Sequence, residues 1–235
     1  MRAIILAGGK GRRLEPYTTV LPKPLMPVDD LPIIEIVIRQ LKNNGFDRIT
    51  IAVGYLAELL EAYLGDGSKY GLEIDYSRET VPLNTMGPVT LIGGIDKTFL
   101  VMNGDILSDL NYSKFIQYHK EKGGIATIAT YRREVNIDFG VIEYDENNKI
   151  KKFIEKPKYE YDVSMGIYVF EPEILNYIPK NRPFGFDQLM KVLIDDEKPI
   201  YSYPYNGYWL DIGRHEDYEK AVKEFPRLRN RFLVD

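Results

Sequence analysis

Hydrophobic residues along this chain alternate between short apolar runs and longer segments with helical spacing. Residues 1–7 form an apolar run of strand length, residues 32–44 carry apolar side chains at helical spacing, and residues 49–53 form a second run. A strand, a helix and a strand in this order indicate that the two strands pair in parallel. The same reading predicts helices at 56–64, 113–122, 172–178, 187–194 and 215–224, and strands at 72–76, 99–102, 125–132, 164–170 and 200–204.

The second half of the chain adds more β-structure. Residues 140–144 and 150–155 flank the polar turn 145–148 and predict a hairpin. We find no internal repeat, low-complexity tract or long linker. The pattern therefore predicts one α/β domain, a Rossmann-like three-layer sandwich with a mixed, mainly parallel central sheet and an added β-rich part, with its ligand crevice at the carboxyl ends of the strands.

The charge and the amino-acid composition of the chain exclude several classes of function. The chain has 235 residues, a formal net charge of −4 and no cysteine. An acidic balance argues against nucleic acid and acidic membranes as partners, and the absence of cysteine excludes disulfides and thiolate nucleophiles. The first apolar run is too short for a signal segment or a membrane span, so we expect a cytoplasmic protein.

A glycine-rich loop follows the first predicted strand. It contains Gly8, Gly9 and Gly11, followed by Arg12 and Arg13. Glycines let backbone amides approach phosphates, and cations neutralise phosphate charge. The loop lacks the Gly-Lys-Ser/Thr of a P-loop and the third glycine of a dinucleotide fingerprint, so it predicts a phosphate site of another kind.

The continuation of this loop is more specific. Pro16, Thr18 and the run Pro22-Lys23-Pro24 extend it into a pattern that resembles the signature of the sugar-1-phosphate nucleotidylyltransferase family, GGxGxRLxPxT followed by PKP. Further segments are similar to the family's motifs in the same order, so the resemblance covers nearly the whole chain. They are Asn103-Gly104-Asp105, Phe139-Gly140-Val141, Glu155-Lys156-Pro157, Met165-Gly166-Ile167-Tyr168 and Trp209-Leu210-Asp211-Ile212-Gly213.

The resemblance implies a reaction in which a nucleoside triphosphate and a sugar 1-phosphate give a nucleotide sugar and pyrophosphate. It implies that Arg13 and Lys23 neutralise the triphosphate, and that Asp105 and Asp211 are catalytic and hold Mg²⁺. Two carboxylates suit a hard cation that prefers oxygen ligands. Between two prolines, Lys23 has a restricted backbone that fixes the place of its ammonium group.

Binding roles carry over residue by residue. The resemblance implies that the nucleotide contacts Leu6, Ala7, Gly8, Gly9, Gly11, Arg12, Glu79, Asn84 and Gly87, and that the sugar phosphate contacts Gly140, Glu155, Lys156 and Gly166. The segment around Asn84 departs from the family pattern Leu-Gly-Thr-Ala-Gly, with asparagine in place of glycine and Met86 in place of a small residue. Asparagine tolerates a positive φ, so the turn is expected to survive.

The resemblance indicates the nucleotide and the sugar less precisely than it indicates the reaction. The closest resemblance is to mannose-1-phosphate guanylyltransferases, which implies GTP with mannose 1-phosphate or a related sugar; glucose-1-phosphate thymidylyl- and uridylyltransferases share the same motifs. A non-catalytic nucleotide-sugar regulator and a nicotinamide-dependent oxidoreductase are the rivals from other classes. Within one nucleotidyltransferase domain, 1–235, we expect a nucleotide-binding half (1–110), a sugar-binding half (111–214) and a C-terminal helix and tail (215–235), in a homodimer or homotetramer.

We assign no catalytic or binding role to two histidines and two aromatic residues. His119 and His215 lack the spacing of a metal site or a triad, and are expected at the surface or at a helix cap. Tyr168 and Trp209 fit core packing at least as well as ligand contact.

Overall fold

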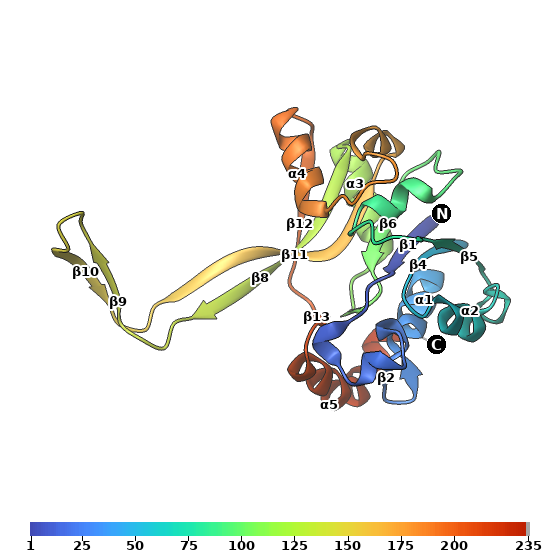
Figure 1. Cartoon of the computed structure of the whole chain (residues 1–235), viewed down its shortest axis with the longest axis horizontal. Helices are drawn as coiled ribbons and strands as arrows, with labels where there is room; N and C mark the ends of the chain where they lie inside the picture. Colours follow the sequence, from blue (N-terminus) through green and yellow to red (C-terminus); the bar gives the residue numbers. More distant parts are fainter. Residues whose placement is uncertain (234–235) are drawn as a thin grey trace.

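The computed structural model describes residues 1–233, and its centre is a seven-stranded sheet with the order β12-β8-β11-β6-β1-β4-β5 (Figure 1). Strand β1 pairs in parallel with β4 and β6, β4 with β5, and β8 with β12, whereas β11 is antiparallel to both β6 and β8. The sheet is therefore mixed and mainly parallel, as the sequence predicts. The strands are β1 (Arg2–Ala7), β4 (Arg48–Val53), β5 (Glu73–Arg78), β6 (Phe99–Asn103), β8 (Ala126–Asn136), β11 (Lys158–Phe170) and β12 (Ile200–Tyr205).

Helices cover both faces of this sheet. Side chains of the core strands alternate between the faces, so that Ile5 and Met102 pack in one hydrophobic cluster and Ile4 and Val101 in the other. The first cluster is closed by α1 (Ile33–Asn43), α2 (Ala57–Leu64) and α3 (Tyr112–Lys122). The second is closed by α4 (Phe186–Asp195) and the 3-10 segments η5 (Gly87–Leu91) and η6 (Pro172–Tyr177). This arrangement confirms the three-layer sandwich.

A third hydrophobic cluster lies beside the carboxyl edge of the sheet, under α5 (His215–Phe232). The sequence placed the end of this helix at residue 224, but it continues to Phe232 and buries both Phe225 and Phe232. Four short strands meet there in two antiparallel pairs, β2 (Pro27–Val28) with β3 (Leu31–Pro32) and β7 (Ile106–Ser108) with β13 (Trp209–Asp211). The remaining short segments are η1 (Arg12–Leu14), η2 (Tyr17–Thr19), η3 (Lys23–Leu25) and η4 (Ser68–Tyr70).

Within residues 1–233, we find no helix that combines the length and the apolar character needed to cross a membrane.

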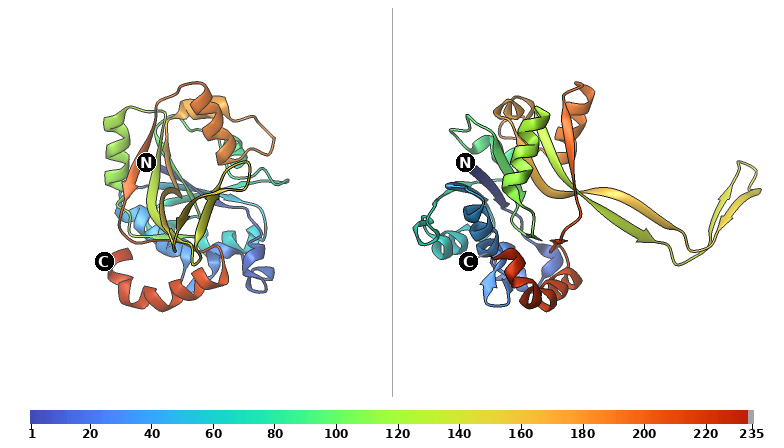
Figure 2. Two further views of the ribbon diagram at one scale, coloured as in Figure 1. Left: turned by 90° about the vertical axis from the view of Figure 1, so that its left-hand side faces the viewer. Right: turned by 180° about the vertical axis from the view of Figure 1, so that it is seen from behind.

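Strands β8 and β11 continue beyond the sheet as a two-stranded arm, which carries the hairpin of β9 (Val141–Tyr144) and β10 (Ile150–Ile154) at its far end (Figures 1 and 2). The hairpin confirms the prediction for 140–155. The sequence-based prediction places the start of β11 at residue 164, six residues too late, although Tyr159, Tyr161 and Val163 alternate with charged residues as in a strand. An irregular register between Ser164 and Tyr168, with Gly166 at a φ of 72°, separates the arm from the sheet.

The prediction for His119 was wrong. Its side chain is 1% exposed, and its ring nitrogens lie 2.7 Å from Thr127 Oγ1 and 3.1 Å from Glu171 Oε1. Burial lowers the pKa of His119, although Glu171 opposes this effect. The residue lies on the inward face of α3, and a histidine with two polar partners fits a buried position there.

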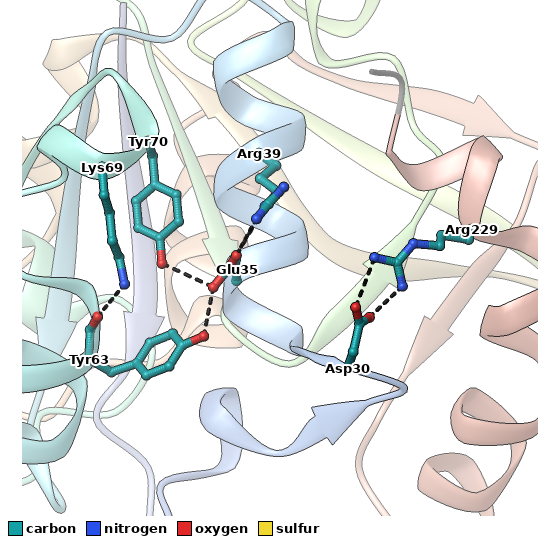
Figure 3. Close-up of polar contacts among 7 residues, drawn as sticks. All are labelled: Asp30, Glu35, Arg39, Tyr63, Lys69, Tyr70 and Arg229. Carbon is teal, nitrogen blue, oxygen red and sulfur yellow. Dashed lines mark hydrogen bonds and ion pairs between the residues drawn. The ribbon is translucent and has the colours of Figure 1, made fainter.

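A buried carboxylate joins α1 to α2 and η4. Glu35 is 6% exposed and accepts hydrogen bonds from the hydroxyls of Tyr63 (2.7 Å) and Tyr70 (3.1 Å) and from the guanidinium of Arg39 (2.6 Å), as Figure 3 shows. Burial alone would raise the pKa of Glu35, but these three donors together hold it below its ordinary value. Figure 3 also shows Arg229 of α5 beside Asp30, an ion pair that fixes α5 to the β2–β3 turn.

We expect Glu35→Gln to lower the free energy of unfolding at pH 7 by about 1–3 kcal/mol, because the amide group replaces one carboxylate oxygen, and either Arg39 or the two tyrosine hydroxyls lose their acceptor. Since the folded-state pKa of Glu35 is depressed, its contribution is complete above the ordinary glutamate value of about 4.3 and is lost as pH falls through the folded value. Urea unfolding at pH 7 and pH 4 measures both effects. The exposed Glu58→Gln is the control; an equal loss in the two variants would contradict the role of this network.

Candidate active site

The loops that follow four parallel strands meet at one edge of the sheet. Because β1, β4, β5 and β6 run in the same direction, their carboxyl ends lie side by side. Backbone hydrogen bonds then fasten the outgoing loops to one another. These bonds run from Gly104 N to Leu6 O (2.9 Å), from Tyr55 N to Gly8 O (3.2 Å) and from Glu79 N to Val53 O (3.0 Å).

The glycine-rich loop leaves β1 directly after Leu6 and Ala7. Gly11 has a φ of 63°, and a Cβ there would come within 2.9 Å of Thr18, whose hydroxyl donates a 2.9 Å hydrogen bond to the Gly11 carbonyl. Gly9 is exposed, with open space where a side chain would project. The loop cations Lys10, Arg12 and Arg13 are exposed, and within the described chain none of them forms an ion pair. They are free to bind an anion.

Lys23 and Asp105 form an ion pair across this edge. Lys23 lies in η3 between two buried prolines, and its ammonium donates to Oδ2 of Asp105, just past the end of β6. Both side chains are mostly buried, with 11% and 19% exposed. The other oxygen, Oδ1 of Asp105, is buried and has no hydrogen-bond partner among residues 1–233. This atom is a free acceptor in a place where acceptors are normally satisfied.

The second aspartate reaches the same place through a short strand pair. In the β13–β7 ladder Asp211 lies opposite Ile106, and the next amide, Ile212 N, donates to the carbonyl of Asp105 (3.1 Å). The Asp211 side chain opens toward solvent, yet the surrounding protein desolvates it, and this, together with the charge of Asp105, raises the pKa of Asp211. Lys23 and Arg13 oppose the shift. Two adjacent carboxylates thus place negative charge at this point, which favours the binding of a cation.

Glu79 lies beside the glycine-rich loop, directly after β5. Its Oε2 accepts the amide hydrogen of Leu83 (2.9 Å), which orients the carboxylate. Its Oε1 occupies the space that a Cβ would need at Gly8 and, at 2.9 Å, at Gly54. A side chain at either position would have to displace the Glu79 carboxylate, which packs against the glycine-rich loop.

The divergent turn after Glu79 keeps the conformation that asparagine permits. Asn84 has a φ of 60° and is exposed, so the turn survives without the usual glycine. Met86 is fully buried in the second core cluster. Gly87 is also buried, and a Cβ there would come within 2.7 Å of Leu83 and 2.9 Å of the Arg182 carbonyl. Close packing is thus the constraint on Gly87.

Three of the sugar-phosphate candidates lie away from the aspartates. Gly140, Glu155 and Lys156 adjoin the β9–β10 hairpin at the end of the arm (Figures 1 and 2). A Cβ at Gly140 would come within 3.3 Å of Glu155 Oε2, so these two residues are neighbours. The arm strand from Lys158 to Ser164 spans about 20 Å at about 3.3 Å per residue, which separates them from the sheet edge.

The fourth candidate, Gly166, lies at the sheet end of the arm. A Cβ there would come within 2.7 Å of the Asn103 amide, the residue two before Asp105. Trp209 lies nearby, and its indole nitrogen donates to the Met165 carbonyl (3.0 Å). Tyr168 is buried and stacked on Phe186 with ring centroids 4.1 Å apart, so it belongs to the core.

The sequence reasoning missed several residues at this edge. Gly54 and Tyr55 follow β4 and contact the glycine-rich loop and Glu79, and Asn103 contacts Gly166. The signal was present for Gly54 and Tyr55, because residues directly after any parallel strand reach the same edge. For Asn103 the neighbour lies on a strand more than sixty positions later, which no local pattern indicates.

A cavity of about 570 Å³ opens at the opposite edge, near the amino ends of β1 and β4. Several of its charged groups bind one another: the amino terminus pairs with Asp47, and Arg2 and Arg48 both pair with Asp75, whereas Lys97 and Lys120 are exposed. The buried carboxylate oxygen without a partner among residues 1–233, with the loop cations near it, is at the carboxyl edge instead. We therefore assign the chemistry to that edge.

Known proteins share this architecture. A family model for Nucleotidyl transferase matches residues 2–227. The UTP–glucose-1-phosphate uridylyltransferase of Synechocystis sp. (strain ATCC 27184 / PCC 6803 / Kazusa) is 37% identical over 243 residues, covering 95% of this chain and 63% of that protein. The mannose-1-phosphate guanylyltransferase catalytic subunit beta of Drosophila melanogaster is 34% identical over 224 residues, covering 92% of this chain and 60% of that protein.

The chain thus spans about three fifths of the length of these curated relatives. Among solved structures, that of HddC from Yersinia pseudotuberculosis superposes with a TM-score of 0.73 at 25% identity, covering 95% of this chain and 99% of that one. Since the family match extends over almost the whole sheet and both aspartate loops, the chain belongs to the nucleotidyl transferase family.

Proposed function

We propose that this protein is a sugar-1-phosphate nucleotidylyltransferase, which transfers a nucleoside monophosphate from a triphosphate to a sugar 1-phosphate and releases pyrophosphate. The observation that carries the proposal is the convergence at one sheet edge of unpaired loop cations, the Lys23–Asp105 ion pair and the carboxylate of Asp211. A triphosphate needs positive charge and backbone amides, and its transfer needs a cation held by oxygen ligands.

Asp105 and Asp211 fit a site for Mg²⁺. A divalent cation would give the buried Oδ1 of Asp105 a partner. Its charge would also favour the ionised form of Asp211, whose pKa is raised. Within the described residues we find no group of three or more histidine, aspartate or glutamate side chains placed to hold a metal, so phosphate oxygens and waters would complete the shell. When bound, Mg²⁺ supplies charge neutralisation at the α-phosphate.

The residues of the chain contribute positioning and charge. The sugar-phosphate oxygen attacks the α-phosphorus in line, and pyrophosphate leaves on the opposite side, so no covalent enzyme intermediate is required. The amides of the glycine-rich loop and the guanidinium of Arg13 bind the departing phosphates. Lys23, whose place is fixed by its prolines and by Asp105, neutralises charge beside the α-phosphate. Residues 1–110 supply these groups, and residues 111–214 form the sugar-binding half.

Glu79 supports guanine as the base. A carboxylate only accepts hydrogen bonds, and guanine presents two adjacent donors, N1–H and the 2-amino group. Uracil and thymine present one donor between two carbonyl oxygens, so a carboxylate would face a repelling oxygen. The Glu79 carboxylate, oriented by Leu83 and packed beside Gly8, favours GTP. The mannose-type sugar rests on the similarity to guanylyltransferases; glucose 1-phosphate with UTP or dTTP is the alternative.

We expect pyrophosphate release when the protein is given Mg²⁺, GTP and mannose 1-phosphate, in a grid that also contains UTP, dTTP, CTP and ATP against glucose and amino-sugar 1-phosphates. Asp211→Asn should reduce kcat by at least about 100-fold, because an oriented charge at the α-phosphate is lost. Its fold should persist, since the neutral side chain relieves the repulsion that raises the pKa of Asp211.

The matched control is Asp96→Asn, an exposed aspartate at the opposite edge, which should keep wild-type turnover. Full activity of Asp211→Asn would remove that residue from the reaction. A wild-type protein that shows nucleotide-dependent melting shifts but no turnover across the grid would instead be a nucleotide-sugar regulator.

We expect Glu79→Gln to change the nucleobase preference. A glutamine offers one acceptor and one amide donor, which match the N3–H and a carbonyl of uracil, and leave one guanine donor unpaired. The ratio of kcat/KM for GTP to that for UTP should fall by about tenfold or more, the size of one lost bidentate contact. Glu15→Gln, at an exposed position directly after η1, is the control. An unchanged ratio in Glu79→Gln would show that the base is recognised elsewhere.

A further inference from the structure

The C-terminal helix α5 begins beside the glycine-rich loop. Its first residue is His215, and residues 212–214 connect that histidine to Asp211. The His215 side chain is exposed, as the sequence predicts, but it does contact another part of the chain. Its Nε2 lies 2.9 Å from the carbonyl oxygen of Glu15, two residues after Arg13. A carbonyl oxygen only accepts hydrogen bonds, so Nε2 carries the hydrogen and donates it to the loop.

Aromatic rings extend the contact between α5 and the loop. The ring of Tyr17 in η2 lies 5.8 Å from that of His215 and 5.9 Å from that of Tyr218, measured between centroids. Both distances are within the range of favourable ring contacts. The hydroxyl of Tyr218 donates to the carbonyl of Pro27 (2.7 Å), which ties α5 to β2 (Figure 1). The first turn of α5 therefore has fixed partners in two segments near the amino end of the chain.

The glycine-rich loop also has a buried anchor under the same helix. Leu14 comes directly after the two loop arginines and is fully buried, with 0% exposed. It belongs to the third hydrophobic cluster, which also contains Ala221 and Phe225 of α5. The Leu14 side chain and the Glu15 carbonyl are thus neighbouring points of the loop, and both are held by α5. The backbone that carries the two arginines ends at these points.

One loop arginine lies against the segment that leads into α5. A Cβ at Gly213 would come within 3.4 Å of Nη2 of Arg13. Burial and the charge of Asp105 raise the pKa of Asp211, and the charge of Arg13 opposes this rise. The Arg13 guanidinium therefore lies near the two aspartates as well as beside the start of α5, where its direction affects both phosphate binding and the charge balance of the site.

We propose that His215 is a positioning residue, which holds the glycine-rich loop in the conformation that binds the triphosphate. The inference rests on the proposed function for the role of the loop. A loop that is held in place before the nucleotide arrives loses less conformational freedom on binding, so the nucleotide binds more tightly. In the competing arrangement, Leu14 alone fixes the loop and the hydrogen bond of His215 has no effect on binding.

Steady-state kinetics with both substrates varied test this role. His215→Ala should raise the KM for GTP about fivefold, the effect of one lost neutral hydrogen bond. It should leave kcat within about twofold of wild type, because the bound triphosphate orders the loop again. The KM for the sugar 1-phosphate should not change, because the loop binds the triphosphate. A general loss of packing would instead lower kcat and raise both KM values, and would contradict the proposal.

A conservative variant isolates the hydrogen bond. His215→Gln should restore the wild-type KM for GTP, because its amide nitrogen is as many bonds from Cα as Nε2 of histidine and can donate to the same carbonyl. The matched control is Lys220→Ala, at an exposed position of α5, which should match wild type. An unchanged KM in His215→Ala would overturn the proposal, and so would a KM in His215→Gln as high as that in His215→Ala.

Hydrogen exchange of the ligand-free protein tests the same contact without turnover. Peptides that cover residues 8–20 should exchange faster in His215→Ala than in wild type, His215→Gln and Lys220→Ala, because one attachment of the loop is lost. Peptides of α3, which packs in the first hydrophobic cluster, should exchange at the same rate in all four proteins. Equal exchange of residues 8–20 in all four proteins would refute the role of His215.

The two proposals fail separately. Faster exchange of the loop in His215→Ala, in a protein without turnover on any substrate pair, would retain the part of His215 in holding the loop and remove the proposed reaction. Turnover with identical kinetic constants in wild type and His215→Ala would retain the reaction and remove His215 as a positioning residue.

Discussion

The parallel pairing of β1 with β4 and β6 is the constraint on which the site depends. It places the carboxyl ends of these strands and of β5 at one edge, so that every outgoing loop begins within reach of the others. The glycine-rich loop, the Glu79 segment and the Asp105 loop then need only short backbone bonds to be fixed together. The ion pair of Lys23 with Asp105 adds the charge that holds η3 against this edge.

The charged groups at this edge favour the binding of added ligands. Lys23 binds one oxygen of Asp105, and the other oxygen is buried without a partner among residues 1–233. Burial, together with the charge of Asp105, raises the pKa of Asp211. The loop cations remain exposed on the other side of the same space. Under the proposed function, a metal ion would bind the first group and a triphosphate the second, and each would lower the free-energy cost of binding the other.

The sequence predicts the sheet core well because the core follows local rules. The apolar period gives β1, α1 and β4 within one or two residues, and the glycine, lysine and aspartate motifs lie where strand ends place them. The β7–β13 pair escapes prediction because three-residue strands have no measurable period. Tertiary packing likewise decides the burial of His119. The early start of β11 was predictable, because Tyr159, Tyr161 and Val163 alternate with charged residues.

The arm shows where local and global preferences disagree. Its strands have β-forming side chains and cross-strand ion pairs, yet 33 residues bury a single proline, which leaves little to stabilise them beyond the ladder itself. Phe139 and Phe153 are exposed to water, and contact with a partner would bury their apolar surface and stabilise the arm. Glu155 and Lys156 belong to the same arm, so a contact that covers these aromatic side chains would also fix the positions of these two charged residues.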